Sequence, residues 1–192
     1  MSGLKSVYFY LIACQIILIK FFKKIYFSSK NYNRSLKSKT PKQIYYNPNP
    51  FLLSIIAPPN NQTFKINDID PNIFWFENKK KETEQMHNFF WLSLLDRKAD
   101  HKKLKKIIYI WMIKNSKYRR KVWETSTLSA RIISWILNTD IILNNSTFDF
   151  RKSFLNCIIS QANHLKKNIK FEKNFNNKIE ILTAIILTGL VF

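Results

Sequence analysis

Apolar residues recur every three or four positions over most of the chain beyond residue 83, which is the spacing of amphipathic helices. Only two glycines are present, Gly3 and Gly189, and a fold with many tight turns or strand bulges would need more. The pattern therefore predicts an all-α fold. The helices predicted in this part cover residues 83–95, 100–114, 123–137, 147–169 and 178–192.

Each of these helices has an apolar stripe that we expect to face a shared core. Residues 100–114 also carry lysines on the opposite side, which indicates a solvated outer face. Thr147 or Asp149 is placed to cap the next helix. The predicted core residues are Leu104, Ile107, Ile108 and Trp111; Phe154, Ile158, Ala162, Leu165 and Ile169; and Ile179, Leu182, Ile185 and Ile186.

The first part of the chain has a different pattern. Residues 1–27 are predicted to contain a helix, and residues 28–82 an extended, proline-rich arm or linker. Prolines at positions 48, 50, 58 and 59 exclude a regular helix and bracket a strand-like run over 51–57, with a second candidate strand at 73–76. The remaining 110 positions, 83–192, form the predicted helical portion.

The N-terminal helix contains an apolar run over residues 7–19, preceded by Lys5 and followed by lysines at 20, 23 and 24. Thirteen residues are too few to span a bilayer, and no small-residue cleavage site follows them. The segment is predicted to be an amphipathic or core helix. Membrane-surface association through residues 5–24 is the alternative.

The formal net charge of +20 points to an anionic partner: nucleic acid, a membrane surface or an acidic polysaccharide. Lysine, asparagine and isoleucine are abundant together, however, as AT-rich codons would produce, and the lysines are spread along the chain. A basic helical module that binds nucleic acid or an anionic membrane surface is therefore kept as an alternative function.

The sequence offers little conventional catalytic or metal-binding chemistry. Cys14 and Cys157 lie far apart without a CxxC or Cys/His cluster, and HExxH, Walker and GxSxG sequences are absent. We expect no metal and no cofactor. His101, among lysines, is predicted to be exposed, and His87 is predicted to be a hydrogen-bonded core histidine.

Arg131 is the most informative residue, because it lies beside Leu128 and Trp135 on the apolar side of its predicted helix. A buried cation needs a partner, and Glu124 is the nearest acid in sequence. One interpretation is an ion pair that fixes a loop to a helix. The other is that the Trp123–Glu124 loop and Arg131 edge a ligand cleft.

Gln161 and His164 share a helical stripe with Cys157. They could present polar groups to a cleft, or they could satisfy loop carbonyls.

Five segments, in this order, resemble the N-terminal helical domain of heparinase II/III family proteins, especially a bacterial branch with a proline-bracketed arm. They are FLLSIIAPPN (51–60), MHNFFWLSLL (86–95), Trp123-Glu124 with ARIISWIL (130–137), QANHL (161–165) and LTAIILTGL (182–190).

The resemblance implies an incomplete (α/α) toroid of antiparallel helix pairs, followed in the family by further toroid helices and a β-sandwich domain. Relatives are polysaccharide lyases that catalyse β-elimination on uronic-acid glycans. An Asn or His neutralises the uronate carboxylate and a Tyr transfers protons. A cleft rich in Lys and Arg would suit that anionic polysaccharide.

The family's catalytic groups are expected beyond Phe192, so we assign no catalytic residue and expect a truncated portion that is inactive alone. Whether the chain is an enzyme is left open. Trp123, Glu124, Arg131, Gln161 and His164 match scaffold positions and are candidates for lining a substrate cleft or for a structural role. The compartment, bacterial cytoplasm or periplasm, is not determined by the two cysteines.

Overall fold

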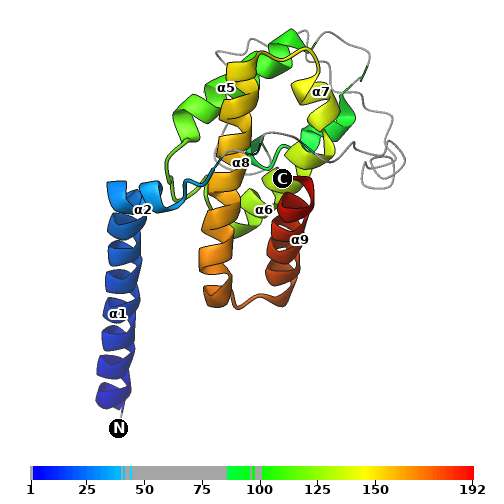
Figure 1. The fold of residues 1–192 in the computed structure, drawn as a ribbon. Coiled ribbons are helices and arrows are strands. Elements are labelled where there is room, and N and C mark those ends of the chain that lie inside the picture. Colours follow the sequence, from blue (N-terminus) through cyan, green and yellow to red (C-terminus); the bar gives the residue numbers. More distant parts are fainter. Residues whose placement is uncertain (1, 40, 42–43, 45–85, 96, 98–100) are drawn as a thin grey trace. The chain divides into compact units, whose positions relative to one another are not determined.

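The computed structural model describes residues 2–39, 41, 44, 86–95, 97 and 101–192, and its regular elements there are helical, which confirms the all-α prediction (Figure 1). The longer helices are α1 (Ser2–Ser28), α5 (Lys102–Asn115), α6 (Thr125–Leu137), α8 (Phe148–Asn168) and α9 (Phe175–Val191). The shorter ones are α2 (Lys30–Ser35), η2 (Phe90–Leu94), α7 (Thr139–Leu143) and η3 (Ile169–Phe171).

The described chain divides into two compact units, residues 1–35 and 36–192. In the first, the buried ring of Tyr32 on α2 lies 4.9 Å from the Tyr26 ring and 4.8 Å from the Phe27 ring of α1. Ser29 Oγ accepts a hydrogen bond from the Tyr32 amide and so supports the start of α2. The prediction of an extended arm from residue 28 is therefore wrong for 30–35, which are helical.

In the second unit, α8 runs antiparallel to α6. Arg131 in the middle of α6 bonds to Gln161 late in α8, whereas Trp135, one turn further along α6, packs its ring 5.0 Å from Phe154 early in α8. Figure 1 shows α9 returning antiparallel beside α8. Thr125 Oγ1 donates to Glu172 Oε2 over 3.0 Å, which holds the start of α6 against the residues that precede α9.

An aromatic cluster occupies the centre of this unit, where η2, α5, α6 and α8 meet. Trp135 has ring contacts with Phe89 at 5.0 Å, Trp111 at 5.2 Å and Phe154 at 5.0 Å, and all four side chains are fully buried. The edge-to-face arrangement of the first two pairs is favourable beyond the area buried. The core stripes predicted for α5 and α8 are confirmed, except that Ile169 is only half-buried.

The helix predicted over 83–95 is confirmed for residues 86–87 and wrong beyond them. After these two helical residues, Phe89 adopts a left-handed φ of 61°, and η2 follows as a 3-10 helix. The cause is tertiary: the carbonyl of His87 accepts from Arg131, and that of Phe89 accepts from Ser134 Oγ at 2.6 Å. Side chains of α6 thus bind carbonyls that a continuous helix would use itself.

The predicted core stripe of α9 is also wrong. Ile179, Leu182 and Ile186 are 47–57% exposed and Ile185 is half-buried. The buried face instead consists of Ile181, Ala184, Thr188 and Val191. The helix is apolar on nearly every side, so periodicity alone does not select the inner face.

The two strand-like runs and the prolines of the predicted arm lie outside the described residues. Among the residues that are described, no helix is both long and apolar enough to cross a membrane.

The observed register of α9 can be tested by alanine substitution. Ile181→Ala should lower the free energy of unfolding by about 2–4 kcal/mol, because a fully buried side chain leaves a cavity. Ile179→Ala, at a site that is 49% exposed, should cost less than about 1 kcal/mol. Urea denaturation measures both, and equal losses would contradict this register.

Candidate functional site

Arg131 is fully buried, and its guanidinium joins three segments of the chain. Nε donates to Gln161 Oε1 at 2.8 Å, one terminal nitrogen donates to the His87 carbonyl at 2.9 Å, and both terminal nitrogens donate to the Val122 carbonyl at 3.1 Å. The guanidinium carbon also lies 4.4 Å from the centre of the Trp111 ring. We call these five residues the Arg131 cluster.

The predicted ion pair between Arg131 and Glu124 is wrong. Glu124 is exposed and precedes α6 without a side-chain capping bond. The acceptors of Arg131 are neutral oxygens, two of them the backbone carbonyls of His87, at the end of a helical segment, and of Val122, in a turn. Arg131 therefore does fix the loop before α6 to that helix, through Val122 rather than through a carboxylate.

The cluster is arranged to hold one buried cation. Burial lowers the pKa of Arg131 to about 9, which leaves it charged at neutral pH. Burial, together with that charge, lowers the pKa of His87 to about 4, so His87 is neutral and its Nδ1 accepts from Trp111 Nε1 at 2.9 Å. His87 is thus hydrogen-bonded, as the sequence predicted, although it is half-buried rather than fully in the core.

Gln161 connects Arg131 to Cys157. Its oxygen accepts from Arg131, and its Nε2 lies 3.0 Å from Cys157 Sγ. Burial of the sulfur raises the pKa of Cys157 to about 11, so the thiol is protonated at neutral pH and is a poor nucleophile.

His164 and Trp123 belong to a second buried group on the same side of α8. The His164 ring lies 5.4 Å from the Trp123 ring and 5.6 Å from the Tyr118 ring, and Trp123 Nε1 donates to the Asn115 carbonyl at 3.0 Å. Burial lowers the pKa of His164 to about 4. Trp123, Arg131, Gln161 and His164 are therefore together in the interior, while Glu124 is apart from them at the surface.

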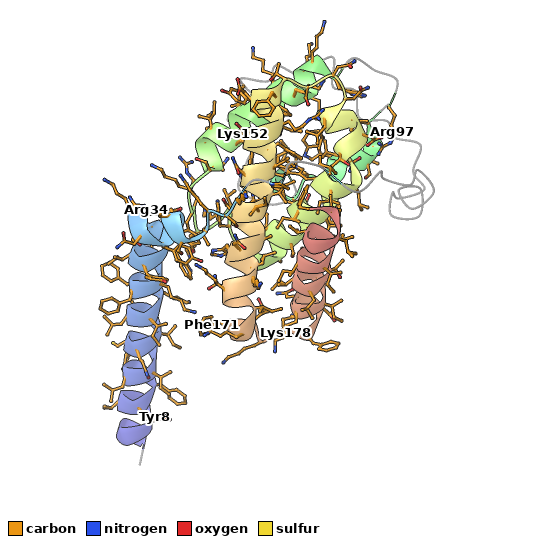
Figure 2. All side chains as sticks on the ribbon, viewed as in Figure 1. Tyr8, Arg34, Arg97, Lys152, Phe171 and Lys178 are labelled. Carbon is orange, nitrogen blue, oxygen red and sulfur yellow. The ribbon has the colours of Figure 1, made fainter. Side chains whose placement is uncertain are left out.

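His101 was predicted to be exposed, and it is buried. It precedes α5, and its Nε2 lies 3.2 Å from the Arg97 carbonyl. The side chain of Arg97 in turn pairs with Asp140 and donates to Asn138 Oδ1 at 2.7 Å, which ties this segment to α7 (Figure 2). The lysines after His101 suggested a wet environment, but they lie on the other faces of α5.

An open groove lies between α5 and α8 in this unit. It consists of two cavities, of about 690 and 410 Å3, that share Tyr109 and Ser153. Apolar groups make up most of its exposed lining, and hydroxyls, one amide and lysines lie among them. The lining that we use below is Lys37, Ser38, Lys105, Lys106, Tyr109, Ser116, Asp149, Ser153, Asn156 and Ser160.

One end of the groove is held by the residues that follow α2. Asn163 Nδ2 donates to the Leu36 carbonyl at 2.9 Å and to Ser38 Oγ at 2.7 Å, so Lys37 is fixed at the groove edge. Leu36 is itself buried.

The groove chemistry suits a hydroxylated, anionic ligand. Serine hydroxyls and the Asn156 amide can each donate and accept hydrogen bonds, and the half-exposed Tyr109 offers an aromatic face. Three lysines against the single carboxylate of Asp149 leave the lining positive. No group of three His, Cys, Asp or Glu side chains that could hold a metal occurs in the described parts of the chain.

The sequence interpretation missed this groove, although its signal was present. Asp149, Ser153, Asn156 and Ser160 follow one another at helical spacing on α8, and Lys105, Tyr109, Met112 and Ser116 do so on α5. Each stripe resembles an ordinary solvated face, and only the packing of α5 against α8 brings the two together.

No family model, no curated protein and no solved structure matches this chain.

The Arg131 cluster predicts a large stability effect. Arg131→Met should lower the free energy of unfolding by about 3 kcal/mol or more, because it leaves buried carbonyls without a donor. Arg131→Lys should recover only part of this, since an ammonium cannot reach three acceptors in the guanidinium geometry. Glu124→Gln is the control and should change the urea midpoint little. A loss at Glu124 as large as that at Arg131 would contradict the assignment.

The two low-pKa histidines predict acid sensitivity. The unfolded chain protonates histidine near pH 6.5, but the folded chain protonates His87 and His164 only near pH 4, so the unfolded state binds more protons between these values. The free energy of unfolding should therefore fall as pH falls from about 6.5 to about 4. In His164→Phe this fall should be smaller, as measured by urea denaturation across that range. An unchanged slope would argue against a buried neutral His164.

Proposed function

We propose that this chain is the N-terminal helical portion of a heparinase II/III-like polysaccharide lyase, and that its α5–α8 groove binds an anionic, uronic-acid-containing glycan. The observation that carries the proposal is the composition of the Arg131 cluster. Three segments that carry the family resemblance, 86–95, the Trp123 region with 130–137, and 161–165, meet at one guanidinium through His87, Val122 and Gln161. His87, Arg131 and Gln161, which lie in three of the matched segments, are thus also partners in space, and Val122 directly precedes the matched Trp123.

The helix directions support the same proposal. In an (α/α) toroid, consecutive long helices are antiparallel and alternate ones lie side by side. Here α8 is antiparallel to α6 and α9, while α6 and α9 pack together with their starts joined through Thr125 and Glu172 (Figure 1). The proposed toroid would continue on the outer stripe of α9, where Phe175, Ile179, Leu182, Ile186 and Leu190 are 47–72% exposed at helical spacing.

The proposed ligand follows from the chemistry of the groove. Glycan hydroxyls would pair with the serines and Asn156, and uronate carboxylates would interact with Lys37, Lys105 and Lys106. In the lyase reaction that the resemblance implies, a proton leaves the carbon beside the carboxylate and the glycosidic oxygen departs from the neighbouring carbon. In this proposal, this chain binds the glycan, and the groups that transfer these protons belong to further polypeptide.

The proposal is tested with matched charge variants. Lys105→Gln/Lys106→Gln should weaken binding of the 192-residue chain to a polyuronate by about tenfold, since each lysine contributes on the order of 0.5–1 kcal/mol. Lys152→Gln/Lys166→Gln removes the same charge from exposed positions of α8 outside the lining and should change binding less than about twofold. Isothermal titration calorimetry measures both, with a neutral glycan as a further comparison.

Three outcomes would overturn the proposal. Equal losses in the two variant pairs would indicate non-specific attraction of a polyanion. Tight, steeply salt-dependent binding of DNA without polyuronate binding would favour the alternative of a basic nucleic-acid module. Formation of unsaturated uronate by this chain alone would show that the proton-transferring groups have been misplaced.

A further inference from the structure

The helix α1 carries an unusual amount of exposed apolar surface. Large side chains on all its sides are 45–71% exposed from Val7 to Tyr26, and Figure 2 shows them projecting around the helix, with Tyr8 near its start. At its last turn, Tyr32 of α2 packs on Tyr26 and Phe27. A helix with this composition normally faces a protein core or lipid.

Apolar side chains are exposed all round α1, but one line along the helix carries no charged residue. At 3.6 residues per turn, Val7, Leu11, Leu18, Phe22 and Ile25 fall on one line along the helix and are 53–64% exposed. We call this line the α1 stripe. The exposed lysines 20, 23 and 24 fall on the opposite half of the helix.

The charge of this unit is wholly of one sign. Residues 1–35 contain five lysines and Arg34 but no aspartate or glutamate, so the unit offers cations to an anionic surface without internal neutralisation. Tyr8, Tyr10 and Tyr26 add aromatic rings with polar ends, which favour the boundary between lipid headgroups and acyl chains.

From these observations we infer that α1 lies in the plane of an anionic membrane surface, with the α1 stripe in the acyl boundary and its lysines at the headgroups. Binding of this kind combines apolar burial with attraction to anionic lipid. A polyanion such as DNA would use the lysines but would leave the stripe in water. If substitutions in the α1 stripe weaken binding, the partner of α1 is therefore a membrane and not a nucleic acid.

The test uses the full 192-residue chain and vesicles of phosphatidylcholine with one quarter phosphatidylglycerol. Leu11→Gln/Leu18→Gln removes two residues of the stripe, and should lower the vesicle partition coefficient at least about tenfold in co-sedimentation. Phe9→Gln/Ile16→Gln is the matched control, because these exposed residues lie on the lysine side. It should lower partitioning less than about threefold. Pure phosphatidylcholine vesicles should bind the unaltered chain more weakly than the anionic ones.

Circular dichroism of each variant on vesicles checks that α1 still forms a helix. Equal loss in the stripe and control variants would overturn the inference, as would equal binding to neutral and anionic vesicles. The chain could instead bind no vesicles but associate with itself, and the stripe variant could abolish that association. This outcome would show that the stripe binds a second copy of the chain. Because the variants leave the groove lysines unchanged, failure here leaves the glycan proposal standing.

Discussion

A buried guanidinium has no water to accept its hydrogen bonds, so the protein must provide the acceptors. In the second unit, three segments of the chain provide them for Arg131. Desolvation of such a cation costs several kcal/mol, so the folded state has to supply acceptors together with packing. Here they come from the turn after Met86, the loop before α6 and the middle of α8. The two backbone carbonyls that bind Arg131 lie where a helical segment ends and in a turn, positions at which a regular helix provides no donor for them.

Periodicity was sufficient for those parts of the fold in which one helix face is clearly more apolar than the others. The inner faces of α5 and α8 followed from it, and Thr147, one of the two predicted candidates, is the N-cap of α8. It failed for α9, where apolar residues surround the helix and small Ala184 marks the buried side better than bulky Ile186 does. Local sequence also could not reveal that Ser134 and Arg131 would take the carbonyls of Phe89 and His87, because those contacts depend on residues more than forty positions away.

In the candidate site, too, some features could be predicted from local sequence and others depended on tertiary contacts. The burial of Arg131 was inferred from its apolar neighbours on the helix. Its hydrogen-bond partners were not, because the prediction considered the nearest carboxylate in sequence, and a backbone carbonyl in a distant segment has no signal in the sequence. The α5–α8 groove was overlooked because each wall, taken alone, has the composition of a solvated face. The charge of +20 predicts an anionic partner without indicating which kind. The two proposals therefore rest on where lysines lie, beside hydroxyls in the groove and opposite an apolar stripe on α1.

The two cysteines differ in a way that has a practical use. Cys157 is held protonated by its surroundings in the groove wall, whereas Cys14 is exposed and lies on α1 between Leu11 and Leu18. A thiol-directed fluorophore at neutral pH should therefore attach first to Cys14. The unaltered protein thus provides its own labelling position for following the polarity around the first helix.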